Sequence, residues 1–560
     1  MNFLVNKISR RSLLRGMGAA LPLLVMPARC FAEAAELEVD LVIIGGGLGG
    51  CAAALAAARN GLNVVMTEET DWIGGQLTQQ AVPPDENKWI ESFGANKSYQ
   101  ALRKGIRDYY RRNYPLTDMA RGKDKLNPGN CWVSAIGCEP RVALAALYEM
   151  LAPYLSDGRI RILLNHKAIA ADAQGDKVVA VRARDVIGGD EITLRAPFFA
   201  DATEQGDLLP MSKTEYSIGA EAKSETGEPH AKEEAQPDNL QGFTFCFAMD
   251  YLAGEDHTIT RPEKYSEWRD LTMTDAGKVD HFLSFEATDS AKIGFDPVAR
   301  KGFWTYRRIA DRDLFRPGFY RSDICVVNWP QNDFSFGRIC EVSESEAKKQ
   351  WARGKNLSMA LLYWLQTEAP RPDGGTGWKG LRLRPDIVGT EDGMAKYPYI
   401  REGRRIKAEF TVLEQYVTTT ARMRETGLPH DEVRALQFPD SVGIGSYHMD
   451  LHLTTRGDRG QFGSTLPFQI PLGALIPKRV ENLLPACKNL GVTHLTNGCY
   501  RLHPVEWGVG EAIGALTAFC LSRKKSPREI RNDRGLLADF QKLLRDDGVR
   551  LEWPKEAGPI

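Results

Sequence analysis

The chain has 560 residues, of which 43% are hydrophobic and 26% charged, a composition typical of a globular protein with two domains rather than one compact core. Its formal net charge is −1, and removing residues 1–32, which carry five basic and no acidic residues, gives −1 − 5 = −6. A mildly acidic mature chain gives no reason to expect nucleic acid as a partner, and none of its apolar runs is long enough to span a membrane.

The N-terminal segment, residues 1–32, has the layout of an export signal. Arg10 and Arg11 stand side by side ahead of a short apolar stretch, residues 16–26, and small residues follow up to Ala32. This order predicts a twin-arginine signal peptide, so the export machinery is an expected partner and the mature protein is expected in the periplasm or secreted. Because this route carries folded proteins, it favours a tightly held FAD over a freely exchanging NAD.

A strand–helix–strand unit is predicted from Val39 to Glu68. Residues 41–44 form a continuous apolar run, typical of a strand buried on both faces of a parallel sheet. An alanine-rich helix follows and ends at Asn60-Gly61, and residues 64–67 predict the second strand.

A dinucleotide site is predicted inside this unit. Gly45, Gly47 and Gly50 have the spacing G-x-G-x-x-G between the first strand and the helix. The first glycine permits a tight turn, the second lets a pyrophosphate approach the backbone, and the third lets helix and strand pack closely. Glu68, at the end of the second strand, is placed to accept hydrogen bonds from a ribose.

The segment after the second strand is predicted to reach the active site. Gly75 lets the backbone approach a flat ligand closely, and Gln76 can hydrogen-bond at the edge of that ligand. Residues 77–139 have mixed composition and are predicted to form an excursion over the active site. Cys131 and Cys138 could form a disulfide in an exported protein.

The region from Pro140 to residue 210 returns to alternating elements. A helix is predicted over residues 140–151, with proline at a tolerated early position. An apolar strand, residues 198–200, leads into a small-residue turn that ends at Asp207, a candidate cofactor contact. Short strands are predicted between helix and turn, at residues 161–164, 178–184 and 191–194. A parallel sheet crossed by a small antiparallel meander is how FAD domains of the glutathione-reductase type are built.

The remaining chain divides into three parts. Residues 211–465 are rich in aromatic residues, arginine and proline and are predicted to form a substrate domain, a sheet covered by helices such as residues 344–366. Residues 466–523 are predicted to complete the FAD domain, which also includes residues 37–76 and 140–210, with a last core strand and a small-residue helix. Residues 524–560 are charged and are predicted to be a peripheral tail.

With these stretches assembled, nearly all of the mature chain resembles a family of FAD-dependent oxidoreductases that contains many secreted bacterial enzymes. The resemblance implies bound FAD, redox activity and an α/β fold, in which a Rossmann-type FAD-binding domain of the glutathione-reductase type holds an inserted mixed α+β substrate domain. Glu204 is a departure, because such proteins commonly have glycine there. The matching stretches are the glycine motif, residues 132–134 with Glu139-Pro140, and residues 227–229, 304–308, 327–333, 399–406, 445–452, 470–472 and 508–515.

The closing helix is predicted to contact the flavin. Gly508 and Gly510 would let its N-terminal N–H groups reach the pyrimidine edge, where the helix dipole favours the negative charge of reduced flavin. Arg501 and His503 lie just before this helix. Because histidine is easily tuned near neutral pH, His503 is the first candidate for the catalytic base.

His448 and His452 are the next candidates for the base. Their i, i+4 spacing is also compatible with a metal-binding helix face, but no third ligand can be placed, so no metal is predicted. A structural alternative is that both histidines are hydrogen-bonded in the core.

Arg401, Arg404 and Arg405, together with Glu402, allow two interpretations. The arginines could bind a substrate carboxylate or the flavin pyrophosphate. Alternatively, they form an ion-paired helix start ahead of residues 406–417.

Two functions remain open from the sequence. The first is an exported dehydrogenase or oxidase that takes a C–H hydride from a small alcohol, sugar or amine and passes electrons to oxygen, a quinone or a cytochrome. The alternative is a maturation or scaffold protein whose flavin acts on a partner protein. The aromatic middle region favours a small-molecule pocket and therefore the first function.

Overall fold

The computed structural model describes residues 35–275, 278–285, 293–460 and 462–558. The predicted signal peptide, residues 1–32, therefore lies outside the described residues. Within the described part of the chain, no helix has the length and apolar character needed to cross a membrane.

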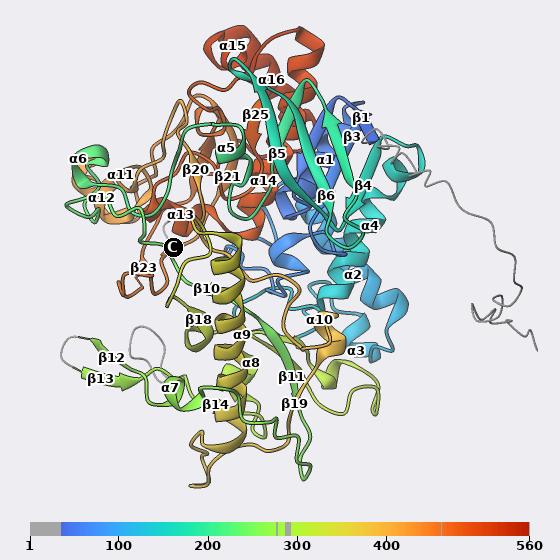
Figure 1. Cartoon of the computed structure of the whole chain (residues 1–560), viewed down its shortest axis with the longest axis vertical. Helices are drawn as coiled ribbons and strands as arrows, with labels where there is room; N and C mark the ends of the chain where they lie inside the picture. Colours follow the sequence, from blue (N-terminus) through green and yellow to red (C-terminus); the bar gives the residue numbers. More distant parts are fainter. Residues whose placement is uncertain (1–34, 276–277, 286–292, 461, 559–560) are drawn as a thin grey trace, which may run out of the picture.

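A five-stranded parallel sheet forms the centre of the cofactor domain, in the order β25-β8-β2-β3-β4. Helices cover one face of this sheet and a second sheet covers the other, which is why its strands are apolar. The predicted strand–helix–strand unit is confirmed, because β2, α1 and β3 follow one another and β2 pairs with β3 in parallel. The strands are β2 (Leu41–Ile44), β3 (Val64–Glu68), β4 (Ile160–Leu164), β8 (Phe198–Asp201) and β25 (Leu483–Pro485). Figure 1 shows this sheet and its helices in the upper half of the molecule.

Two helices pack closely on this sheet because their contact surface is made of small residues. They are α1 (Leu48–Arg59) and α14 (His503–Arg523). A Cβ added to Gly510 would lie 1.9 Å from the carbonyl oxygen of Gly49. The closing helix thus begins five residues earlier than predicted: Gly508 and Gly510 lie inside it and do not form its N-terminus.

A four-stranded sheet covers the other face, in the order β1-β7-β6-β5. Its strands are β1 (Ala35–Glu38), β5 (His166–Gln174), β6 (Lys177–Asp185) and β7 (Glu191–Arg195). The two predicted meander strands correspond to β6 and β7, whereas β5 was not predicted. Its sequence HKAIAADAQ has no regular alternation of apolar and polar residues, which explains the omission.

The segment predicted as an excursion over the active site contains a long helix, α2 (Lys97–Asn113), which packs on α4 (Pro140–Ser156). The buried positions of α2 recur on one face but stand among seven basic or acidic residues, which hide the helical pattern. A one-turn helix, α3 (Asp118–Arg121), follows. Cys131 and Cys138 are separate buried thiols here.

The middle region is built on a four-stranded antiparallel sheet in the order β16-β17-β11-β19. The predicted helix over residues 344–366 is confirmed as α9 (Glu344–Thr367), the long helix in the lower half of Figure 1. The strands are β11 (Phe247–Tyr251), β16 (Arg308–Ala310), β17 (Ile324–Val327) and β19 (Leu381–Leu383).

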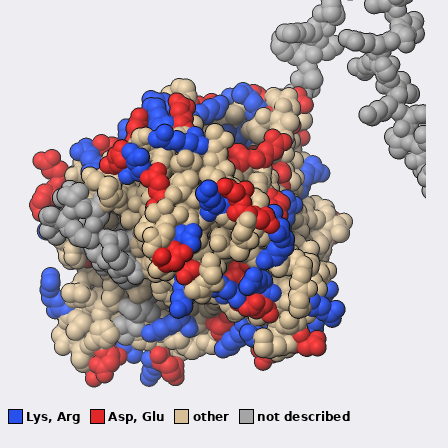
Figure 2. All heavy atoms as spheres, turned by 90° about the horizontal axis from the view of Figure 1, so that it is seen from below, with Lys and Arg blue, Asp and Glu red and all other residues tan. Residues whose placement is uncertain are grey.

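Basic and acidic side chains are interspersed on the lower face of the molecule (Figure 2).

Two further expectations are wrong. The predicted helix over residues 406–417 is extended at its start, as β20 (Arg405–Ile406), and helical only at α11 (Glu414–Val417). The C-terminal tail is not peripheral, because α15 (Pro527–Asn532) and α16 (Arg534–Asp546) pack on α14. Their apolar side chains Ile530, Phe540 and Leu544 are fully buried.

Candidate functional site

The glycine loop has the backbone that the motif requires. Gly45 has φ +100°, and a Cβ there would lie 2.3 Å from the carbonyl oxygen of Ala202. A Cβ at Gly50 would lie 2.3 Å from the carbonyl oxygen of Gly45. At Gly47 a Cβ would lie 3.3 Å from Glu506 Oε1 and 3.4 Å from Ala202 O and Glu204 Oε1, so this position is less obstructed than Gly45 or Gly50 but still tightly surrounded. The motif predicts the pyrophosphate beside this glycine.

Glu68 lies beside this loop, at the carboxyl end of β3. Its Oε2 accepts a hydrogen bond from the Gly46 N–H at 3.1 Å, and its Oε1 accepts one from the Thr70 N–H at 2.8 Å. Burial raises the pKa of Glu68 to about 8. One narrow pocket beside the glycine loop is lined by Glu68, Glu69 and Asp207. The two acids predicted as cofactor contacts, Glu68 and Asp207, therefore lie in the same pocket.

Two residues that the sequence did not single out complete this end of the site. Lys488, just after β25, forms a buried ion pair with Glu204. It neutralises the charge that glutamate brings to a position where glycine is common in similar proteins. The Oε1 of Glu506 accepts a hydrogen bond from the Gly49 N–H at 3.0 Å, at the N-terminus of α1. Among the described residues, Glu204, Glu506 and Cys487 are the one group whose metal-ligand atoms lie within 4.8 Å of one another.

Gln76 connects the glycine loop with the closing segment. Its Nε2 donates hydrogen bonds to Glu506 Oε2 and, at 3.1 Å, to the carbonyl oxygen of Arg501. Gly75 has φ +54°, and a Cβ there would lie 2.9 Å from Gly47 Cα. The structure therefore brings the predicted Gly75-Gln76 pair against the predicted dinucleotide loop.

His503 is not placed to act as the base, which corrects the first choice made from the sequence. Its Nδ1 accepts a hydrogen bond from the Asp85 N–H at 3.1 Å, and its Nε2–H donates to the carbonyl oxygen of Val82 at 3.2 Å. The ring is fully buried, and burial lowers its pKa to about 4. Both nitrogens thus hold the excursion against the N-terminus of α14, and neither is free to take a proton.

His452 is the predicted histidine that lies in a charged network. Its Nδ1 is 2.5 Å from Asp333 Oδ2, and its Nε2 is 3.3 Å from Asp450 Oδ2. Each carboxylate also meets an arginine, Arg401 at 2.9 Å from Asp333 and Arg501 at 3.1 Å from Asp450. Although burial raises the pKa of Asp450, the neighbouring His452 and the charge of Arg501 hold it well below its usual range.

The network continues toward the N-terminal excursion. Arg501 also donates a hydrogen bond to the Tyr399 hydroxyl at 2.7 Å. Arg307 pairs with Asp85 at 2.9 Å, and its guanidinium lies 5.5 Å from the centre of the Tyr306 ring. The middle region, the excursion and the closing segment therefore all contribute side chains to one site.

The alternatives left open by the sequence are now resolved in part. His448 is half-buried, and burial lowers its pKa. It does not share a helix face with His452, because the chain between them forms the strand β22 (Met449–Asp450). The arginine run is ion-paired: Arg401 with Asp333, Arg404 with Asp207, and Arg405 with Glu221 and Glu402.

Buried polar atoms without protein partners test whether the site fits FAD. They include Gln76 Oε1, which belongs to the pair packed against the glycine loop, and Arg501 Nε, whose own carbonyl oxygen accepts a hydrogen bond from Gln76. A buried polar atom without a partner costs about 1–3 kcal/mol, so these atoms indicate a polar ligand. The backbone of the glycine loop and Glu68 at the end of β3 fit a dinucleotide. The residues therefore fit FAD, with the pyrophosphate against the glycine loop and the adenosine beside Glu68.

Comparison with known proteins agrees with this fit. A model of the family described as FAD dependent oxidoreductase matches residues 40–544. No curated protein has a significant match.

Several solved structures are similar at low identity. L-proline dehydrogenase from P. horikoshii is 16% identical over 34% of this chain and 25% of that chain, with a TM-score of 0.19. Glycerol-3-phosphate dehydrogenase from Bacillus halodurans, complexed with FAD, is 15% identical over 38% of this chain and 40% of that one, with a TM-score of 0.22. Both matches span less than half of the other protein. Quinol fumarate reductase of E. coli is 9% identical over 91% of this chain and 74% of that one, with a TM-score of 0.32.

Proposed function

The chain belongs to the family of FAD-dependent oxidoreductases, and from this premise we propose that it is a dehydrogenase or oxidase acting on a C–H bond of a small polar substrate. The observation that carries the proposal is His452, held between Asp333 and Asp450 with 20% of its side chain exposed. A partly exposed histidine oriented by a carboxylate is the arrangement that a general base requires.

FAD supplies the hydride acceptor when it is bound. The protein moves the proton. With its Nδ1–H donated to Asp333, His452 presents the lone pair of Nε2 to a substrate O–H or N–H. Asp450 Oδ2, 3.3 Å from Nε2, becomes the hydrogen-bond acceptor for the new N–H once the proton has moved. The two carboxylates therefore stabilise the positive charge that the imidazole gains.

The arginines keep these carboxylates ionised and fixed. Arg401 and Arg501 are almost fully buried, so each forms a strong ion pair with its aspartate. Removing Arg401 would take the ion-pair partner from the buried carboxylate of Asp333, whereas Asp450 is one-quarter exposed and would lose less on removal of Arg501. We assign Arg401 and Arg501 positioning roles, whereas His452 is the catalytic base.

We also propose that the enzyme is exported in the folded state and that its electrons pass to oxygen or to a quinone or cytochrome of the cell envelope. This part rests on the signal layout of residues 1–32. Replacing Arg10 and Arg11 by lysine is expected to keep the protein in the cytoplasm, measured by cell fractionation. Unchanged delivery of the double variant to the envelope would contradict the twin-arginine route.

The enzymatic proposal is tested by anaerobic reduction of the purified protein. Small alcohols, sugars and amines are added, and loss of the yellow flavin absorbance is followed. His452→Gln keeps the size and polarity of the side chain but removes the base, so it is expected to slow reduction about a hundredfold while FAD content stays the same. Wild-type protein that holds FAD and is reduced by none of these compounds would contradict the proposal.

A further inference from the structure

A cavity of about 180 Å³ lies beside the segment that carries His452. Leu451, the residue before His452, is part of its wall, whereas the His452 side chain is not. The side chains of His230 and Lys232, which are 55% and 36% exposed, mark its opening to solvent. Because a cavity of about 150 Å³ can hold a benzene molecule, this one has room for a ligand of similar size.

One part of the cavity wall is apolar. Leu451 and Leu495, the second residue of α13 (His494–Tyr500), are each 5% exposed and pack together with Met449. Ala231 packs against this cluster and also lines the cavity. Such a surface holds the carbon atoms of a ligand, because it offers no hydrogen bonds to water.

The acids in the wall differ in their partners. Glu221 pairs with Arg405 at 2.8 Å, and Asp458 pairs with Lys232 at 2.7 Å. Glu228 has no basic partner within the described part of the chain, although 1% of its surface is exposed. It is therefore the one acid of this wall whose charge no side chain balances.

Inside the protein, one carboxylate oxygen of Glu228 is used. Its Oε1 accepts hydrogen bonds from the Thr493 hydroxyl at 2.7 Å and from the Glu414 N–H at 2.8 Å. Among the described residues its Oε2 has no hydrogen-bond donor, so this oxygen is left to the cavity that Glu228 lines. Burial raises the pKa of Glu228 to about 7, and the nearby carboxylates of Glu221 and Glu414 contribute to the increase.

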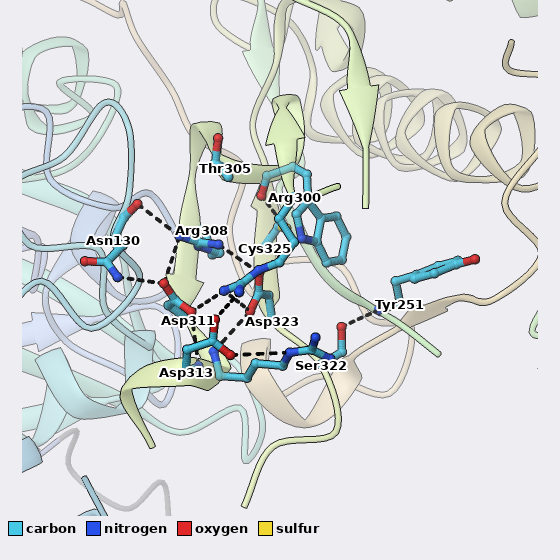
Figure 3. Close-up of polar contacts among 12 residues, drawn as sticks. Asn130, Tyr251, Arg300, Thr305, Arg308, Asp311, Asp313, Ser322, Asp323 and Cys325 are labelled. Carbon is cyan, nitrogen blue, oxygen red and sulfur yellow. Dashed lines mark hydrogen bonds and ion pairs between the residues drawn. The ribbon is translucent and has the colours of Figure 1, made fainter. Parts of the chain in front are cut away.

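A buried acid is usually neutralised by a base, since an isolated buried charge is costly. Figure 3 shows this arrangement in the middle region. There Asp323 pairs with Arg308 at 2.8 Å and with Arg300 at 2.7 Å, and Asp311 pairs with the same two arginines. Glu228 has no such base, so a cation in the cavity would complete the equivalent pair.

The basic side chains of the cavity wall are engaged by other groups. Three of them are paired with acids, and Arg459 has an interaction partner as well. The pairs are His230 with Glu414, His494 with Glu402, and Lys232 with Asp458. The charged group that remains for a ligand is therefore Glu228.

Hydrogen bonds connect this cavity to the backbone of His452. His494 Nδ1 lies 2.9 Å from both carboxylate oxygens of Glu402, whose Oε2 accepts a hydrogen bond from the Gln241 N–H at 3.2 Å. Gln241 Oε1 in turn accepts one from the His452 N–H at 3.2 Å. The cavity thus adjoins the proposed catalytic site without including the His452 side chain.

We propose that this cavity is a second ligand site, which binds a small organic ammonium ion with its N–H groups on Glu228 Oε2 and its carbon atoms against Leu451 and Leu495. A metal ion fits less well, because the apolar wall offers it no ligand atoms. In the described chain, moreover, the acids and histidines of this wall do not form a group close enough to share one metal ion. The site goes beyond the proposed function, since no bond is made or broken in it.

The first test uses tert-butylamine, whose nitrogen-bearing carbon has no hydrogen, so a flavin cannot take a hydride from that carbon. Its binding to the FAD-loaded protein is measured by calorimetry at pH 7.5 and compared with that of neutral tert-butanol and anionic trimethylacetate. The ammonium ion is expected to bind at least tenfold more tightly than either, because it alone can pair with Glu228. Equal affinities, or no binding of tert-butylamine, would overturn the proposal and leave the oxidoreductase function standing.

The second test locates the bound ammonium ion. Glu228→Gln keeps an oxygen for Thr493 and Glu414 but loses the charge, so it is expected to weaken tert-butylamine binding at least tenfold. Glu233→Gln is the matched control and should bind the amine normally, since the Glu233 side chain is 85% exposed. Ala231→Phe fills the cavity and should abolish binding of the amine, which tests the site even if Glu228→Gln does not fold. Wild-type affinity for tert-butylamine in Ala231→Phe, or in a folded Glu228→Gln, would overturn the proposal.

Discussion

Replacing His503 by glutamine separates a structural histidine from a catalytic one. In the folded protein, burial holds the pKa of His503 at about 4, against about 6.5 when the chain is unfolded. The unfolded chain therefore takes up a proton between pH 6.5 and pH 4 that the folded chain does not. Stability from this group is complete above pH 6.5 and is lost as the pH falls toward 4. The linkage relation predicts that this group lowers the free energy of unfolding by about 2 kcal/mol between pH 7.5 and pH 5.

His503→Gln removes this titration and can still donate to the carbonyl oxygen of Val82 through its own Nε2. We therefore expect its unfolding free energy, measured by urea denaturation, to fall about 2 kcal/mol less than that of the wild type between pH 7.5 and pH 5. At pH 7.5, His503→Ala is expected to be less stable by about 3 kcal/mol, because it leaves the Asp85 N–H and the Val82 carbonyl oxygen unsatisfied.

The kinetic arm of the same experiment uses flavin reduction. His503→Gln is expected to reduce its flavin at nearly the wild-type rate, since neither ring nitrogen is available for proton transfer. A hundredfold slower reduction in His503→Gln, with unchanged stability and FAD content, would refute this reasoning and restore His503 as the base.

Gly47→Ala is expected to fold but to bind FAD at least tenfold more weakly, measured by fluorescence titration, because its Cβ would stand where the motif brings the pyrophosphate against the backbone; normal affinity would argue against a pyrophosphate there. Gly510→Ala should instead lower the unfolding free energy by about 3 kcal/mol, since its Cβ would overlap Gly49, and an unchanged value would show that the helices separate freely. The cofactor-free wild type should lose stability as the pH rises from 4.5 to about 8, because in this range the Glu68 carboxyl keeps its proton in the folded chain but not in the unfolded chain. Glu68→Gln should not show this loss. Parallel pH profiles of variant and wild type would contradict the raised pKa. Lys488→Met should destabilise the protein by about 3–5 kcal/mol by leaving Glu204 unpaired, and adding Glu204→Gln should recover most of the loss, whereas no recovery would mean that the two groups act separately.

The cofactor domain could be predicted because its signals are local. The apolar run at residues 41–44, the three glycines and the acid at Glu68 lie within 28 residues, and each has a direct steric or hydrogen-bonding reason. The start of α14 was also readable, because Pro504 occupies one of the first helical positions. The glycines Gly508 and Gly510 suggest a ligand-binding N-terminus at a later position, whereas in the structure Gly510 packs against α1.

The candidate site could not be predicted to the same extent because its partners are far apart in the chain. His452 meets Asp333 across 119 positions, and Lys488 meets Glu204 across 284. No local pattern in the sequence distinguishes His452 from His503. In the fold His503 is fully buried, whereas the His452 side chain is partly exposed. The sequence identified both as candidates, and only the folded contacts show that the His503 ring is held by backbone groups whereas the His452 ring lies between two carboxylates.

The most direct measurement of the central claim is the rate of anaerobic flavin reduction in wild type and His452→Gln, each loaded with one FAD per chain. The substrate is the compound that reduces the wild-type flavin, supplied with either hydrogen or deuterium at the reacting carbon. The account predicts a primary isotope effect in the wild type and a rate about a hundredfold lower in His452→Gln with the same FAD content. Equal reduction rates in the two proteins would contradict it.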